Sequence, residues 1–286
     1  MSSKIPPTDD ETARGWWRTE IIDIAPGEIR IRGYAIEQLI GNISFPSMIW
    51  LMLRGELPTP AQASLLEAVL VAAVDHGPQA PSIATARMAI TCGIGLNNAI
   101  ASGVNALGDV HGGAGAQCME LLAHLHAMIA RGDGSEPFEL SIASEIRRWQ
   151  NEHGKFLPGY GHRFHPVDPR AVRLTELLEE AKKDGAIGGD FLKLGRAVET
   201  HLGLGRRAPI PMNIDGITAV VLLELGFPPP LGRGVFILSR AVGICAHAWE
   251  EMQEGRRIKG PLPPALGFLY TGHPPRSISG TRKNAE

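Results

Sequence analysis

Four short runs of the sequence each place a histidine, an aspartate or an arginine among small residues. They are Asp75–Pro78, Gly108–Ala114, Pro158–Arg163 and Pro211–Gly216. Small residues, and glycine above all, let a ligand approach the backbone closely, so these runs are candidates for a binding or reacting site. A fold that brings them together would unite acid–base side chains with exposed backbone N–H groups.

His111 and Asp215 are the two candidates for acid–base chemistry that lie next to predicted helix starts. His111 precedes two glycines and an amphipathic helix, where free N–H groups and the helix dipole favour an oxygen that gains negative charge. Asp215 follows Asn213 and opens an apolar helix. For both residues, capping of the helix start is the structural alternative.

Two arginines occupy positions that are hard to explain as solvated charges. Arg240 lies inside the apolar run Phe236–Val242, and Arg170 follows Asp168 and Pro169. Arginine is rarely buried unless an anion pairs with it. The two residues therefore predict a ligand that carries a carboxylate.

The run Pro158–Gly161 cannot form a helix and lacks the lysine and glycine spacing of a phosphate-binding P-loop. Its backbone is able to hydrogen-bond a flat base, although a plain turn is the alternative. Two histidine pairs, His162 with His165 and His124 with His126, have no carboxylate or thiolate at a familiar ligand spacing. We therefore predict no metal site, and we interpret His124, His126 and His247 as core or interface residues.

The elements that must position these runs are mostly helices. Two short strands, Thr19–Ile24 and Glu28–Arg32, are predicted on either side of a proline-glycine turn. From residue 34 onward, apolar residues recur at helical spacing and are interrupted by Gly and Pro. Helices are expected at about 34–41, 45–54, 60–75, 82–104, 112–131, 140–153, 169–184, 190–203, 214–225 and 233–255. The fold class is therefore mainly α with a short N-terminal β-hairpin.

The composition narrows the class of protein. The formal net charge is −2, which excludes broad nucleic-acid binding through a basic surface. Three scattered cysteines do not make a disulfide framework or a four-thiolate zinc site, which favours reduced thiols in the cytoplasm. No leader and no membrane-spanning run of apolar residues is expected.

Taken in order, the motifs resemble those of the citrate synthase family. They include Arg32-Gly33-Tyr34, Gly55–Thr59, His111-Gly112-Gly113-Ala114, Gly159–Arg163 with Asp168–Arg170, and Asp215 before Leu225–Pro228. The resemblance implies an α-helical homodimer whose small domain closes over the substrate. The corresponding domains would be residues 1–112 with 226–286 (large) and 113–225 (small).

The family resemblance also implies carbon–carbon bond chemistry between acetyl-CoA and oxaloacetate. Asp215 would be the base on the thioester methyl group, His111 the donor to the thioester oxygen and His162 the donor to the oxaloacetate carbonyl. A thioester methyl is a far weaker acid than a carboxylic acid, so Asp215 would need a donor that stabilises the enol oxygen. With no metal site in the sequence, that task falls to His111.

The remaining site residues are implied by the same resemblance. His76, Arg170 and Arg240 match positions that hold the keto-dicarboxylate. Pro158, Gly159, Tyr160 and Gly161 match a loop that receives the adenine of CoA. The CoA thioester is a substrate or product, and no other cofactor is expected.

Departures from the family pattern favour cleavage of citryl-CoA, or a close 3-hydroxyacyl-CoA relative, to acetyl-CoA and oxaloacetate. The run Asp75–Pro78 is similar to the citryl-CoA lyase part of ATP-citrate lyase, and Gly260 stands where the family has an arginine before a proline. Lys259 is a candidate replacement for that arginine. Two alternatives stay open: a citrate or 2-methylcitrate synthase, and an inactive CoA-binding regulatory paralogue.

Overall fold

The computed structural model describes residues 15–132, 137–161 and 167–277. A small antiparallel sheet, β1 (Ile22–Ala25), β2 (Glu28–Ile31) and β3 (Tyr34–Ala35), opens this part of the chain. Ile22 pairs with Ile31, and Ala25 pairs with Glu28 across the turn at Gly27, whose φ is 81°. The predicted hairpin is confirmed, with a short third strand added to it.

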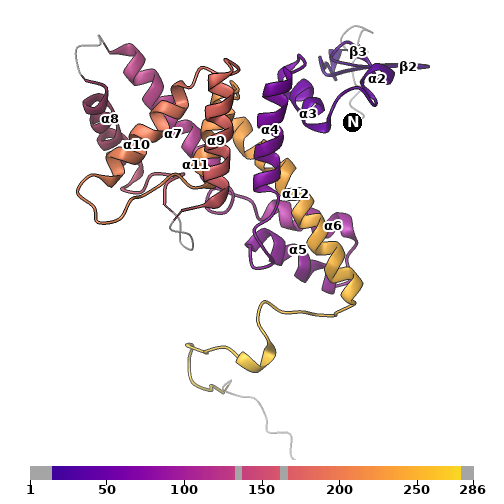
Figure 1. Cartoon of the computed structure of the whole chain (residues 1–286). Coiled ribbons are helices and arrows are strands. Elements are labelled where there is room, and N and C mark those ends of the chain that lie inside the picture. The colour runs from indigo at the N-terminus through magenta and orange to yellow at the C-terminus, as the bar shows by residue number, and fades with distance from the viewer. Residues whose placement is uncertain (1–14, 133–136, 162–166, 278–286) are drawn as a thin grey trace, which may run out of the picture.

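Helices make up most of the rest, which confirms the mainly α fold class (Figure 1). They are α2 (Ile36–Leu39), α3 (Phe45–Arg54), α4 (Pro60–Ala73), α5 (Pro81–Thr91), α6 (Leu96–Asn105), α7 (Ala114–Arg131), α8 (Phe138–His153), α9 (Pro169–Lys183), α10 (Asp190–Gly203), α11 (Ile214–Glu224) and α12 (Pro229–Glu254), followed by the 3-10 turn Pro264–Leu266.

Two predicted helices differ from the structure. The segment 34–41 begins with β3 and keeps only the four-residue helix α2, and the predicted helix 82–104 is wrong. The segment 82–104 is two helices, α5 and α6, which are separated by Cys92–Gly95. Gly93 adopts a φ of 84°, which glycine reaches without strain and which ends α5, and Gly95 is the N-cap of α6. Apolar spacing continues across the break because both helices pack on α12, so periodicity alone does not show it.

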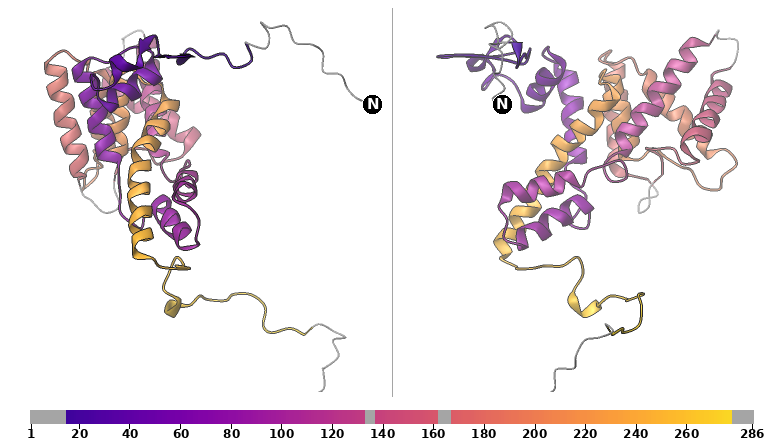
Figure 2. Two further views of the ribbon diagram at one scale, coloured as in Figure 1. Left: turned by 90° about the vertical axis from the view of Figure 1, so that its right-hand side faces the viewer. Right: turned by 180° about the vertical axis from the view of Figure 1, so that it is seen from behind.

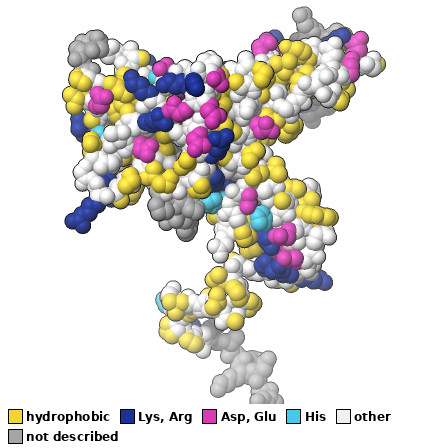
Figure 3. Space-filling view, in the orientation of Figure 1, with side chains coloured by type: hydrophobic (Ala, Val, Ile, Leu, Met, Phe, Trp, Pro, Cys, Tyr) yellow, Lys and Arg dark blue, Asp and Glu magenta, His cyan; other side chains and the backbone are white. Residues whose placement is uncertain are grey.

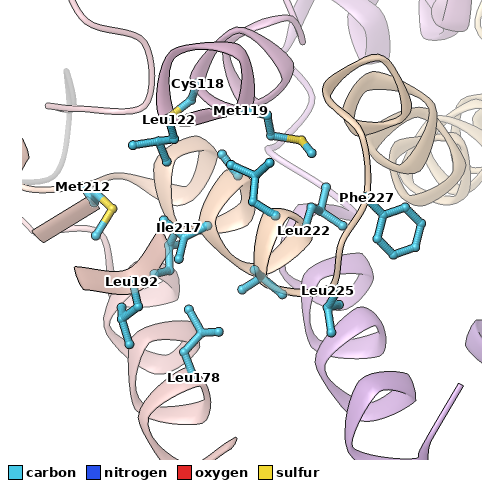
Figure 4. Packing of buried hydrophobic residues seen from close by; sticks show 14 of the residues in the cluster. Cys118, Met119, Leu122, Leu178, Leu192, Met212, Ile217, Leu222, Leu225 and Phe227 are labelled. Atoms are coloured by element: carbon cyan, nitrogen blue, oxygen red, sulfur yellow. The ribbon is translucent and has the colours of Figure 1, made fainter. Parts of the chain in front are cut away.

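Helix α11 is the centre of the main hydrophobic core, because apolar residues surround it on every side. Residues Gly216 to Leu223 are all buried, and the helix packs against α4, α7, α9 and α10. Figure 4 shows Cys118, Met119 and Leu122 of α7 on one side of Ile217 and Leu222. Leu178 and Leu192 lie on another side (Figure 4). We call this region the α11 core.

The C-terminus of α11 is closed by a glycine. Gly226 has a φ of 73°, the N–H of Phe227 donates to the carbonyl of Leu222, and that of Gly226 donates to Leu223. This pair of backbone hydrogen bonds is the Schellman motif, which provides donors for the last carbonyl groups of the helix. The chain then turns into the 26-residue helix α12.

A second, smaller core lies between α5, α6 and the C-terminal half of α12, side by side in Figures 1 and 2. It contains Ile83, Ala86, Ile90, Ala99 and Ile244. Gly103 allows close packing, since a Cβ there would lie 2.8 Å from both the side chain of Ile244 and the carbonyl oxygen of Ser82. We call this region the α5–α6 lobe. After α12, the chain runs away from the body (Figure 2).

No single helix in the described segments is long and apolar enough to cross a membrane. Helices α11 and α12 pass such a test only as a pair, and they meet at a bend of 119°. The cytoplasmic location and the two-domain boundaries stay predictions from the sequence.

Candidate active site

A cavity of about 540 Å³ lies where α4, α5, α7, α9, α11 and α12 meet. Its lining includes six of the predicted site residues: His76, His111, Gly161, Arg170, Asp215 and Arg240. Glycine and alanine from the start of α7, together with Phe236 and Leu222, complete much of the wall. The structure therefore brings together side chains from runs up to 164 residues apart in sequence. His162 lies outside the described residues, and its predicted role stays a prediction.

The ring of His111 is oriented by the start of α5. The backbone N–H of Ser82 donates to Nε2 of His111 over 3.1 Å, and Ser82 Oγ lies 3.0 Å from the same nitrogen. Because a backbone N–H can only donate, Nε2 must be an acceptor, and the proton of the neutral ring must be on Nδ1. Burial, and then the charges of Arg240 and His76, lower the pKa of His111. His111 is therefore suited to act as a neutral donor through Nδ1.

Asp215 occupies the second position of α11, and the helix cap is a different residue. The side chain of Asn213 accepts the N–H groups of Asp215 and Gly216, over 2.9 and 3.2 Å. Asn213 therefore takes the capping role that was the alternative for Asp215, and it leaves the Asp215 carboxylate at the cavity wall. Its charge acts on Arg240 across the cavity and on the buried thiol of Cys118, whose pKa is raised mainly by burial.

The two arginines differ in how their charge is matched. Asp168, which is 2% exposed, accepts Nε and Nη2 of Arg170 over 3.0 and 2.9 Å. Arg240 is 5% exposed, donates from Nε to the carbonyl of Ala73 over 3.1 Å, and lies against the ring of Phe236. Among the described residues, no acceptor is found for its terminal nitrogens. The predicted anion therefore has its clearest cationic partner in Arg240.

The run Pro158–Gly161 packs against the start of α11. Gly161 donates to Pro211, and Asn213 donates from its backbone to Gly159 and from its side chain to Gly161. A Cβ at Gly159 would lie 2.6 Å from Cys118 Sγ and 2.7 Å from Gly216 Cα, so only glycine fits there. The hydroxyl of the partly buried Tyr160 donates to the carbonyl of Gly195. This run therefore positions Asp215, and its predicted contact with adenine stays a prediction.

Sequence reasoning missed Ser82. Its only local signal is its place after a proline at a helix start, and its partner His111 lies 29 residues further along the chain.

The described residues contain no group of three or more His, Cys, Asp or Glu side chains that could hold a metal ion.

Comparisons with known proteins identify the family and the fold. Residues 11–65 and 58–261 match the family described as citrate synthase, C-terminal domain. The solved citryl-CoA lyase from Hydrogenobacter thermophilus is 33% identical, covers 92% of this chain and 97% of its own, and superposes with a TM-score of 0.80. The ATP citrate lyase from Methanothrix soehngenii, 20% identical with a TM-score of 0.75, covers 95% of this chain and 46% of its own, and supports the fold.

The citrate synthase of Heyndrickxia coagulans is 29% identical over 239 residues. That match covers 82% of this chain and 58% of the relative. The chain therefore spans little more than half the length of this curated relative.

Proposed function

The chain belongs to the citrate synthase family, and we propose that it cleaves citryl-CoA, or a close 3-hydroxyacyl-CoA relative, to acetyl-CoA and oxaloacetate. The observation that carries the proposal is the match to a citryl-CoA lyase over 92% of this chain and 97% of that one. The cavity supports it, because a neutral imidazole, a carboxylate and a buried arginine line one space.

The proposed cleavage is a retro-Claisen step. His162 accepts the proton of the tertiary hydroxyl, and the bond between the hydroxyl-bearing carbon and the methylene next to the thioester breaks. The hydroxyl carbon becomes the carbonyl of oxaloacetate, and the bonding electrons pass into the enolate of acetyl-CoA. Asp215, entering the step as the acid, protonates the methylene carbon to give the methyl group. Proton exchange with solvent restores both residues.

His111 is proposed to stabilise the enolate oxygen. Its Nδ1–H would donate to that oxygen while Ser82 holds the opposite side of the ring. A preorganised donor of this kind typically contributes about 10²–10³-fold in rate. The proton affinity of Nδ1 in a neutral ring is closer to that of the enolate oxygen than the proton affinity of an imidazolium nitrogen would be. Similar proton affinities favour a strong hydrogen bond between the two atoms.

The oxaloacetate half is proposed to lie toward His76, Arg170 and Arg240. Of these, Arg240 offers unmatched cationic nitrogens within the described part of the chain, whereas Arg170 is already paired with Asp168. We assign the main carboxylate contact to Arg240 and a supporting role to Arg170. The CoA adenine is proposed to lie against Pro158–Gly161.

A homodimer is part of the proposal. The C-terminal segment exposes Phe268 and Leu269, which are 91% and 87% exposed, and Figure 3 shows its apolar side chains away from the body. Large exposed apolar groups on an extended segment favour a protein partner. Light scattering after gel filtration should give twice the chain mass, and a monomer at micromolar concentration would contradict this part.

One experiment tests the reaction. Purified protein is incubated with citryl-CoA, oxaloacetate is followed through reduction by malate dehydrogenase, and free thiol is followed with a disulfide reagent. Cleavage gives oxaloacetate without thiol, because the CoA stays in acetyl-CoA. Absence of oxaloacetate would overturn the proposal.

The same assay separates the second candidate, a citrate or 2-methylcitrate synthase, which the curated relative favours. A synthase hydrolyses citryl-CoA, so it would release free thiol and citrate. It would also release thiol from acetyl-CoA, or propionyl-CoA, mixed with oxaloacetate. An inactive paralogue would bind CoA and give no product in either mixture.

A further inference from the structure

Helix α12 holds the segment that leads into His76 by four consecutive contacts along one face. Ser239 donates to the carbonyl of Leu70, and Arg240 donates to that of Ala73. A Cβ at Gly243 would lie 2.2 Å from the carbonyl oxygen of Val74, so the backbone can approach only because this residue is glycine. His247, one turn further, reaches Asp75.

The geometry of His247 defines which of its nitrogens carries a proton. Nε2 lies 3.2 Å from Oδ1 of Asp75, and Nδ1 lies 3.2 Å from Nη1 of Arg87. Because a guanidinium can only donate, Nδ1 must be the acceptor, which places the proton of the neutral ring on Nε2, facing the carboxylate. Asp75 is therefore approached on that oxygen by the protonated nitrogen, in an ionic contact and not in an aligned hydrogen bond, because Oδ1 is buried and has no hydrogen-bond partner among the described residues.

The other oxygen of Asp75 accepts the backbone N–H of Gly77 over 3.1 Å. The carboxylate of Asp75 thus accepts from the backbone just after His76 with one oxygen and faces His247 with the other. Burial raises the pKa of Asp75, but the N–H of Gly77 and then His247 outweigh it, so that the pKa is lowered overall. An ionised Asp75 fixes the backbone on both sides of His76, which lines the cavity.

Arg87 is itself held in place. Its Nε and Nη2 contact Oε2 of Glu251 over 2.8 and 2.7 Å, and the side chain of Glu251 is fully buried. Lys259 contacts the same carboxylate over 3.1 Å. Because two of its nitrogens bind the same buried oxygen, the guanidinium of Arg87 is held in one orientation, and that orientation presents Nη1 to His247 and to Glu250.

We propose that His247, oriented by Arg87, is a positioning residue that sets the place of His76 in the cavity and thereby the affinity for the oxo acid. The role in oxo-acid affinity rests on the proposed function, whereas the placement of His76 does not. His247 does not line the cavity, so it acts through Asp75.

The test compares His247→Gln with His247→Leu. Glutamine can place its NH₂ near Asp75 and its oxygen toward Arg87, whereas leucine offers neither group. Oxaloacetate and CoA are titrated separately by calorimetry. We expect His247→Leu to weaken oxaloacetate binding roughly tenfold, the scale of one charge-assisted hydrogen bond from His76 to the oxo acid. The CoA affinity should stay within about twofold of wild type. We expect His247→Gln to retain most of the oxaloacetate affinity.

Two further variants keep the test decisive. His247→Asn accepts from Arg87 but is too short for Asp75, so it breaks one contact without placing an apolar group in the network. His124→Leu, which removes the histidine 3.7 Å from Glu145 on α8, is the matched control outside the cavity. Equal losses for oxaloacetate and CoA, or an unchanged oxaloacetate affinity in both His247→Leu and His247→Asn, would show a structural role only.

A ligand-free readout separates this inference from the proposed function. Long-range proton–nitrogen NMR spectra of the histidine rings should show His247 with its proton on Nε2, and the His76 signals should move in His247→Asn but not in His124→Leu. Unmoved His76 signals would overturn the positioning role. If wild-type protein binds no oxaloacetate, the proposed function fails while the spectra still decide the placement of His76.

Discussion

The α11 core and the α5–α6 lobe hold their parts of the cavity by different physical means. Asp215 is placed by an apolar helix buried over eight consecutive residues and by backbone packing against Gly159. His111 and His76 depend on the lobe, whose apolar core is small and whose helices are tied by charged side chains around Glu251. We therefore expect the loss of apolar side chains to destabilise the α11 core. Loss of a charged side chain or a change of pH should destabilise the α5–α6 lobe.

The largest effect is expected from Asp215→Asn. The amide has the shape of the carboxylate but no transferable proton, so turnover of citryl-CoA should fall by roughly 10³–10⁴-fold. The thermal midpoint and CoA affinity should stay close to wild type, because Asn213 and the buried face of α11 are untouched. Asp184→Asn, an exposed residue at the end of α9, is the matched control. Turnover within tenfold of wild type would remove Asp215 from the reaction.

The next effect is on stability, and it belongs to the lobe. Glu251→Gln removes a fully buried charge that Arg87, Arg256 and Lys259 share, and it leaves three cations facing a neutral group. Breaking one side of such a pair costs about 3 kcal/mol of unfolding free energy. The urea concentration at the midpoint of unfolding should therefore be clearly lower than in wild type. Glu180→Gln, in an exposed pair with Arg173, should change it by less than about 1 kcal/mol.

A smaller effect on the free energy of unfolding is expected when the pH changes, and it again arises in the α5–α6 lobe. The pKa of His111 is lowered from its usual 6.5, mainly by burial, so the unfolded chain binds this proton more readily. The free energy of unfolding should therefore fall as the pH drops through 6.5, and this loss should stop below the lowered pKa. Denaturation of His111→Gln should show a reduced slope in that window.

A second histidine is the control for this slope. The pKa of His201 on α10 is also lowered by burial, and next by Arg147, so His201→Gln removes its own share of the pH dependence. Activity separates the two, because protonation of Nε2 of His111 would oppose the N–H of Ser82 and disturb the donor. We expect activity to fall with decreasing pH, and the pH at which half the activity is lost should be the same in His201→Gln as in wild type. Identical slopes in wild type and His111→Gln would contradict the assignment.

Sequence reasoning located the apolar α11 region better than the lobe. Asp215, His111 and Arg240 line one cavity, as the family resemblance implied. The glycine-rich runs and the apolar spacing by themselves only marked close approach and burial. The lobe depends on contacts between distant polar side chains. Ser82 with His111, and Arg87 with His247, have no local pattern, and His247 was interpreted as a core or interface residue.

Arg170 shows a related difficulty. Its sequence position predicts a ligand carboxylate, yet Asp168, two residues earlier, already supplies one as the cap of α9. A cap and an ion pair use the same carboxylate, and the sequence motif does not show whether the arginine turns back on it. The burial of Arg170 was therefore a weaker signal than that of Arg240, which has no such neighbour in its helix.

The smallest effect is expected at Lys259. It decides whether Lys259 contacts the substrate in place of the family arginine, where this chain has Gly260. Lys259 Nζ lies 3.1 Å from Glu251 of its own chain, and its backbone N–H donates to Thr91, so its ammonium is engaged within the lobe. Lys259→Met should therefore lower stability by about 1 kcal/mol or less, because the pair is partly exposed. Oxaloacetate affinity should change less than about threefold, whereas loss of a direct charge-assisted contact would weaken it roughly thirtyfold. Calorimetric titration distinguishes the two values. A thirtyfold loss would mean that Lys259 leaves Glu251 to reach the substrate, and it would then rank with Arg240 rather than with the residues that stabilise the lobe.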